Sequence, residues 1–180
     1  SHTMPNRDSI LRELSSHVSA KVTVPLQFGS FVWWEEVISN PSRSSREIFS
    51  IQTASPLHGV FFEPVTSADQ WAFLRSAFSP EASSQASPPS HCVLLAPFNP
   101  ALPIERDMLV PVSETSEGGE WRLTLEPGER VAVALCIRCE AVLPRTRGSE
   151  GGELTLSVSC PSSQLLPHWK RSYTPAPQET

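Results

Sequence analysis

The sequence predicts an all-β protein built as a sandwich of two sheets. Three segments in its second half alternate between apolar and polar residues, at 120–125, 131–139 and 154–159. A period of two buries one face of a strand and leaves the other in water. The first two segments are separated by the turn Glu126-Pro127-Gly128-Glu129. Three such strands joined by short turns are typical of half a β-sandwich of the immunoglobulin-like type.

The first half of the chain adds the remaining strands. Strands are expected at 22–28, 31–38, 47–53, 60–62 and 92–95, with an edge strand at 108–112. Turn-forming residues separate them, as at Gly29-Ser30 and in the run Asn40-Pro41-Ser42-Arg43-Ser44. We therefore expect about eight strands in all. The bulky residues at the inward positions of these strands are expected to be buried in the core, and they are Trp121, Leu123, Val133, Leu135, Leu156 and Val158.

Two short helices are expected beside the strands. Residues 1–4 have the composition of a tag remnant, and an apolar stripe predicts an N-terminal helix at 5–20. Ser67 and Gln70 have the spacing of a capping box, and Pro80 ends the helix that follows.

Segments without a strand pattern complete the domain organisation. Residues 79–90 are rich in Ser, Pro and Ala and predict a mobile loop. The immunoglobulin-like sandwich is assigned to 21–160, and 161–180 to a Pro- and Ser-rich tail. The tag remnant also suggests that the chain is a fragment of a larger protein.

Composition narrows the classes of partner. The 180 residues carry a net charge of −5 and 18 prolines, and the basic residues do not cluster. This argues against nucleic acid as the main partner. No apolar stretch reaches about 18 residues, so no membrane insertion is expected. We expect the module to be monomeric and to bind other proteins.

Cys136 and Cys139 match the spacing C-x-x-C, which is compatible with a zinc half-site or a redox pair. Both chemistries require the two sulfurs to lie on one side of a turn. Here the motif falls inside an alternating strand, where residues three apart point to opposite faces. Reduced structural thiols are therefore the favoured interpretation, and we expect no metal and no cofactor.

Candidate sites are few. Glu35 and Glu36 are adjacent in a strand, so they point to opposite faces and cannot form an acid–base dyad. One of them is expected at an edge or paired with Arg43 or Arg46. We predict that the chain is not an enzyme. Trp33 and Trp34 cannot both face one core, so one of them is expected under a helix or exposed as an aromatic contact for another protein.

Three segments in this order carry a family resemblance. They are Gln27-Phe28-Gly29 followed by Phe31–Ile38 and Asn40-Pro41, then Phe62–Arg75, then Leu125-Glu126-Pro127-Gly128-Glu129. Together they resemble the immunoglobulin-like, major-sperm-protein-type modules of the nephrocystin-4 family, over about residues 10–142. Gln70 stands where that family more often has Glu.

The resemblance implies a non-catalytic protein-binding or spacer module of a scaffold. Such scaffolds lie in the cytoplasm at the ciliary base, in the transition zone or basal body, and belong to the cytoskeleton involved in cilium biogenesis. The implied partners are other transition-zone proteins of the nephrocystin group. The major-sperm-protein likeness implies an alternative, an adaptor that captures a short acidic peptide motif. That alternative requires a basic groove, and the chain has only the lysines Lys21 and Lys170.

Overall fold

The structure is a computed structural model and describes residues 20–79, 88–105, 108–143, 152–163, 166 and 168–177. The expected tag remnant, almost all of the N-terminal helix, and residues 80–87 of the Ser/Pro loop lie outside the described residues. The strands are β1 (Lys21–Leu26), β2 (Phe31–Ser39), β3 (Glu47–Ala54), β4 (Val60–Pro64), β5 (Cys92–Leu94), β6 (Leu109–Thr115), β7 (Gly118–Leu125), β8 (Arg130–Cys139), β9 (Leu154–Ser159) and β10 (Trp169–Pro177), and the helix is α2 (Ala68–Phe78).

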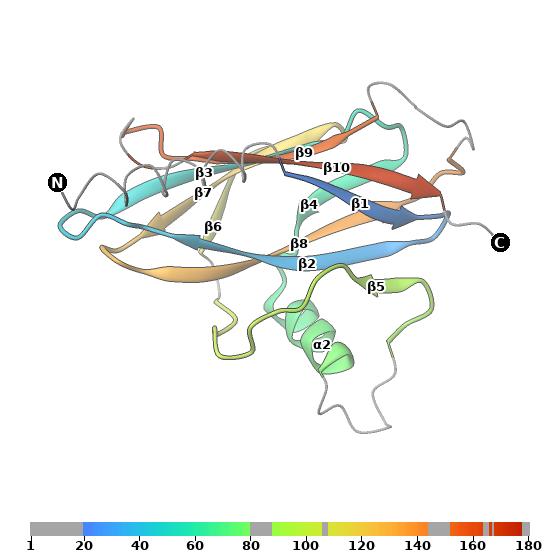
Figure 1. Cartoon of the computed structure of the whole chain (residues 1–180), viewed down its shortest axis with the longest axis horizontal. Coiled ribbons are helices and arrows are strands. Elements are labelled where there is room, and N and C mark those ends of the chain that lie inside the picture. The colour runs from blue at the N-terminus through green and yellow to red at the C-terminus, as the bar shows by residue number, and fades with distance from the viewer. Residues whose placement is uncertain are drawn as a thin grey trace, which may run out of the picture.

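The strands form two stacked sheets, which confirms the predicted all-β sandwich (Figure 1). The larger sheet has the order β1-β10-β9-β3-β7-β6, and the smaller one has the order β4-β8-β2-β5. Most neighbours are antiparallel, but β1 runs parallel to β10, and β2 runs parallel to β5. The immunoglobulin-like type of this sandwich stays a prediction.

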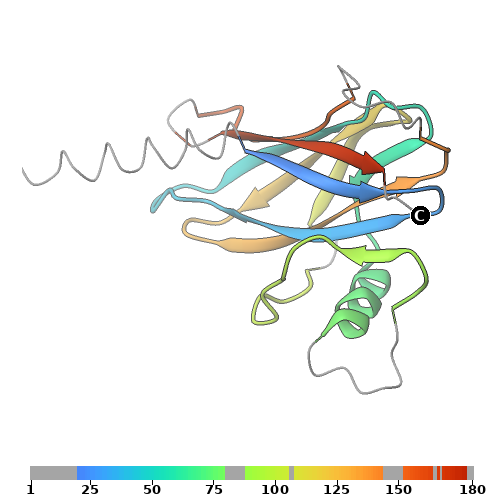
Figure 2. The same ribbon diagram turned by 45° about the vertical axis from the view of Figure 1, so that its right-hand side comes forward.

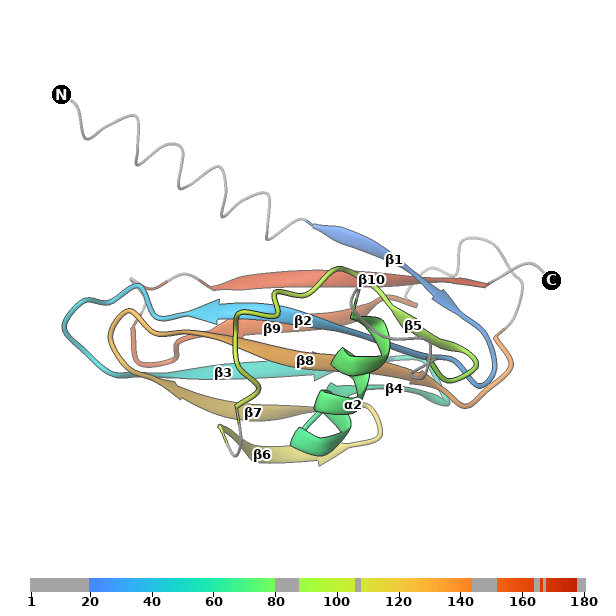
Figure 3. The same ribbon diagram turned by 90° about the horizontal axis from the view of Figure 1, so that it is seen from below.

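The main core lies between the two sheets, where the sequence placed it. The six predicted core residues Trp121, Leu123, Val133, Leu135, Leu156 and Val158 are all exposed by 3% or less. A second apolar cluster lies on the opposite face of the four-stranded sheet, under α2, and includes Trp33, Trp71 and Leu74. Figures 2 and 3 show α2 lying against the outer face of this sheet.

The helix α2 begins where the capping box predicts. The Ser67 hydroxyl accepts a hydrogen bond from the backbone N–H of Gln70 at 3.2 Å, and the helix ends at Phe78, two residues before Pro80. Its buried side chains are Trp71, Leu74 and Ala77, so one stripe of the helix packs on the sheet. None of the described helical residues forms a segment that meets the length and apolarity required to cross a membrane.

The structure corrects the boundary assigned at residue 160. Residues 169–177 form β10, which lies inside the six-stranded sheet between β1 and β9. The pattern was missed because Arg171 occupies an inward position between Trp169 and Tyr173, so the alternation is not purely apolar. The sandwich therefore includes the segment that composition assigned to a tail.

Two smaller boundaries also differ from the prediction. The strand predicted at 120–125 begins earlier, at Gly118, and the turn between β6 and β7 consists of residues 116–117. The first strand ends at Leu26, and Phe28 lies in the turn that leads to β2.

Candidate functional site

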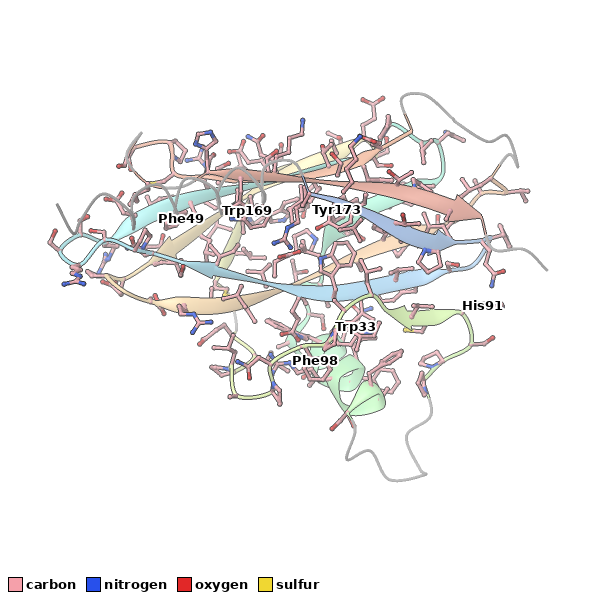
Figure 4. The ribbon with its side chains drawn as sticks, viewed as in Figure 1. Trp33, Phe49, His91, Phe98, Trp169 and Tyr173 are labelled. Atoms are coloured by element: carbon pink, nitrogen blue, oxygen red, sulfur yellow. The ribbon has the colours of Figure 1, made fainter. Side chains whose placement is uncertain are left out.

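The two adjacent tryptophans point to opposite sides of the four-stranded sheet, as alternation requires. Trp33 is 0% exposed and packs under α2 against Phe78 and Phe98, and Trp34 is 2% exposed and lies between the sheets. Figure 4 shows Trp33 and Phe98 on the helix side of the sheet. Of the two alternatives expected for the second ring, burial under a helix is confirmed and exposure to a protein partner is wrong, because α2 and Phe98, which lies in the loop after β5, cover Trp33.

Glu35 and Glu36 also diverge, and each is held by an arginine that the sequence did not suggest. On the outer face, Glu35 accepts two hydrogen bonds from Arg75, both within 2.8 Å, and one from the indole N–H of Trp71 at 2.7 Å. Arg75 also donates to the backbone oxygen of Leu102 at 2.7 Å. These contacts hold α2 against the four-stranded sheet, so the Glu35 carboxylate has a structural role.

In the inter-sheet core, Glu36 is 7% exposed and lies against β10. Its carboxylate accepts hydrogen bonds from Arg171 at 2.5 and 2.6 Å, from the Tyr173 hydroxyl at 3.2 Å and from the Trp34 indole at 3.1 Å. Burial, and next the charge of Glu36, raises the pKa of Tyr173 far above its ordinary value. The expected pairing with Arg43 or Arg46 is wrong, since Arg46 binds Glu126 instead.

The cysteines of the C-x-x-C spacing lie on opposite faces of β8, as the sequence predicts. Cys136 belongs to the cluster under α2 and Cys139 to the inter-sheet core. Burial raises the pKa of Cys136 to about 12, so its thiol stays protonated at neutral pH. Among the described residues, no group of three or more His, Cys, Asp or Glu side chains could hold a metal ion.

Unpaired sheet edges can accept a strand from another protein, but each of the four edges of this sandwich has a feature that hinders the addition of a strand. On β4, the backbone oxygens of Val60 and Phe62 accept hydrogen bonds from the Ser55 and Thr53 hydroxyls at 2.6 and 2.8 Å. The strand β6 contains Pro111 and an irregular register between residues 111 and 113. Proline and bulges are common means of protecting an edge.

The other two edges are protected differently. The strand β5 has only three residues. The strand β1 contains Pro25, whose backbone has no N–H to donate, and it is the least protected edge. Strand addition is therefore not the contact mode that this architecture favours.

A hollow on the outer face of the six-stranded sheet is the larger of the two principal cavities in the described part of the chain, with a volume of about 310 Å³. We call it the trough. Two rows of outward residues cross β6, β7, β3 and β9 in register and form it. One row is Thr115, Gly118, Ala54 and Thr155, and the next is Ser113, Glu120, Gln52 and Ser157.

The first row makes the hollow, because its central members Gly118 and Ala54 have almost no side chain. A Cβ atom at Gly118 would clash with the backbone oxygen of Thr53, and the φ of +144° also favours glycine. The turn residue Glu117 and the longer Gln52 and Glu120 rise beside this floor. The trough therefore presents hydroxyl, amide and carboxylate groups.

Sequence reasoning missed the trough. Ala54 and Gly118 lie just outside the strands predicted at 47–53 and 120–125, and they are 64 positions apart. Only the pairing register of four strands brings them together.

A smaller cavity of about 100 Å³ lies beside α2, with Val65, Trp71 and Met108 in its lining. It adjoins residues 106–107, which lie outside the described residues, so the trough is the better-defined candidate site. In comparisons with known proteins, no family model, no curated protein and no solved structure matches this chain.

Proposed function

We propose that this chain is a non-catalytic protein-binding module of a scaffold at the ciliary base. The observation that carries the proposal is the trough, a hollow lined by hydrogen-bonding groups on the outer face of the six-stranded sheet. The helix α2 packs on the other sheet and does not cover it. The buried carboxylates of Glu35 and Glu36 serve to join elements of the fold. The Cys136 thiol is held protonated, which makes it a poor nucleophile.

The ciliary setting rests on the resemblance to the modules of the nephrocystin-4 family. Two of the segments that carry this resemblance contact each other in the fold. Glu35, from the segment Phe31–Ile38, binds both Trp71 and Arg75, from the segment Phe62–Arg75. The resemblance therefore falls on residues that act as one structural unit, which supports a shared fold more than a chance match of short motifs.

The alternative adaptor function, capture of an acidic peptide, is less well supported. It requires a groove that carries positive charge. The charged residues that line the trough are Glu117 and Glu120, whose carboxylates would repel an acidic segment. We therefore retain the scaffold function as the proposal.

The test uses the full-length parent protein in ciliated cells. In one variant residues 20–177 are deleted, and in a second they are replaced by an unrelated β-sandwich of similar size. Affinity purification should show that both variants lose at least one partner that the wild-type protein retains. If the replacement variant alone retains every partner, the module is a spacer. If both variants retain every partner, the module has no scaffold role. A parent protein that never reaches the ciliary base would overturn the ciliary assignment.

A further inference from the structure

The trough has the dimensions of a site for a short extended peptide. It crosses four neighbouring strands, and strands in a sheet lie about 4.8 Å apart, so its length is about 14 Å. An extended chain advances about 3.4 Å per residue, so about four residues would span the trough. Because Gly118 cannot carry a side chain without a clash, the floor stays open to a backbone that approaches closely.

The walls of the trough provide unused hydrogen-bonding capacity. Within the described residues, the hydroxyls of Thr155 and Ser157 take part in no internal hydrogen bond, and both side chains are half-buried. Gln52 is exposed, and its amide N–H already donates a hydrogen bond to the Glu120 carboxylate, so its amide oxygen is the group left to accept. These groups match the alternating N–H and C=O groups of an extended peptide backbone.

The two ends of the trough carry opposite charges. Glu117 and Glu120 lie at the β6–β7 end, while Lys170 is the register neighbour of Ser157 at the β10 end. Arg122 lies 3.3 Å from Glu120 and neutralises part of its charge, so Glu117 is the more available carboxylate. A hydrogen bond from Ser50, at 2.6 Å, lowers the pKa of Glu120 and keeps it ionised.

We propose that the trough binds an extended segment of a partner protein and places a Lys or Arg side chain of that segment between Glu117 and Glu120. This inference rests on the proposed protein-binding function and names the face and the chemistry of the partner. Recognition combines backbone hydrogen bonds to Gln52, Thr155 and Ser157 with one cationic contact. A neutral or acidic segment lacks that contact.

The test measures binding of two fluorescein-labelled octapeptides by fluorescence anisotropy at low salt. One peptide alternates Lys and Thr, and the other alternates Glu and Thr. The variant Ala54→Phe fills the floor, and Thr124→Phe is its matched control, because Thr124 is also exposed on the outer face of the sheet but lies outside the trough. The variant Glu117→Gln removes the more available charge, and Glu114→Gln on β6 removes a charge outside the trough.

The Lys–Thr peptide should bind the wild-type protein in preference to the Glu–Thr peptide. Ala54→Phe should weaken binding at least about tenfold, because the phenyl ring fills the floor of the trough. The variant should still fold, because aromatic residues suit exposed strand positions. Glu117→Gln should weaken binding about two- to fivefold, the range of an exposed ion pair, and this difference should shrink as salt rises. Both control variants should bind within about twofold of the wild-type protein.

Absence of saturable binding of the Lys–Thr peptide below about 1 mM, or equal binding by Ala54→Phe and wild-type protein, would overturn the inference. Circular dichroism spectra must show that each variant is folded before its binding is compared with that of the wild-type protein. A cell experiment separates this inference from the broader proposal. If a parent protein with Ala54→Phe retains every partner that the sandwich replacement loses, the module binds partners by another face, and only the trough inference fails.

Discussion

The buried ion pair between Glu36 and Arg171 gives the sharpest test of how the sheets are held together. The variant Arg171→Met removes the guanidinium that faces the carboxylate but keeps a long apolar side chain on β10. Glu36, which is 7% exposed, would then retain only hydrogen bonds from Tyr173 and Trp34. Its negative charge would stay in the core without a compensating positive charge from β10.

The size of the effect follows from burial. Removing one partner of a fully buried ion pair costs about 3–5 kcal/mol. The Arg171 side chain is 23% exposed, so water reaches part of the site and reduces the penalty. We expect a loss of about 2–4 kcal/mol in the free energy of unfolding, which shifts the urea midpoint by about 1–2 M for a slope of about 2 kcal/mol/M.

The assay is urea unfolding followed by far-UV circular dichroism, with unchanged slopes as the condition for comparing midpoints. The control is the double variant Glu36→Leu/Arg171→Met, in which both charges are gone and an apolar contact replaces them. It should be more stable than Arg171→Met, because no charge is left stranded. A loss below about 0.5 kcal/mol in the single variant, or a double variant less stable than the single one, would refute the reasoning.

Three further predictions concern the core, the trough floor and the thiol. Leu135→Ala should lower the free energy of unfolding by about 2–5 kcal/mol in urea melts, and a loss below about 0.5 kcal/mol would contradict its inward assignment. Gly118→Ala should cost at least about 1 kcal/mol more than Gly128→Ala, because both need a positive φ but only Gly118 has a backbone oxygen in the way; equal costs would contradict this. Burial raises the pKa of Cys136 from 9.0 to about 12, so the unfolded chain ionises this thiol first. Its contribution to stability is therefore constant below pH 9 and falls as pH rises through that window, and Cys136→Ala should show a smaller loss of stability between pH 8 and 10.5 than the wild-type protein.

Local periodicity was enough to predict most strands and the direction of their side chains. Trp121, Leu123 and Leu135 are buried because alternation is set by backbone geometry, which each strand carries by itself. For the same reason the opposite orientations of Glu35 and Glu36 follow from their adjacent positions in one strand. The cap at Ser67 was equally predictable, because its partner lies three residues away.

What fills the space opposite each side chain was decided by the tertiary structure. Alternation showed that Trp33 and Trp34 face different sides, but the cover over Trp33 comes from α2 and from Phe98, 65 positions along the chain. The ion pair of Glu36 with Arg171 joins residues 135 positions apart. Arg171 itself concealed β10, because a charged residue at an inward position obscures the apolar period that identifies a strand.

The trough shows the same division between local and long-range information. The sequence alone determined that Ala54 and Gly118 are small, and the folded structure extends β3 to Ala54, whose side chain faces outward. Their position side by side depends on how β3 pairs with β7 and how β9 pairs with β3. A strand's period is fixed by its own backbone, whereas its register is fixed by contacts with partners distant in sequence, and a shift of one residue would reverse the face of every side chain. The sequence therefore determined which residues could line a hollow, and only the folded sheet determined that they meet.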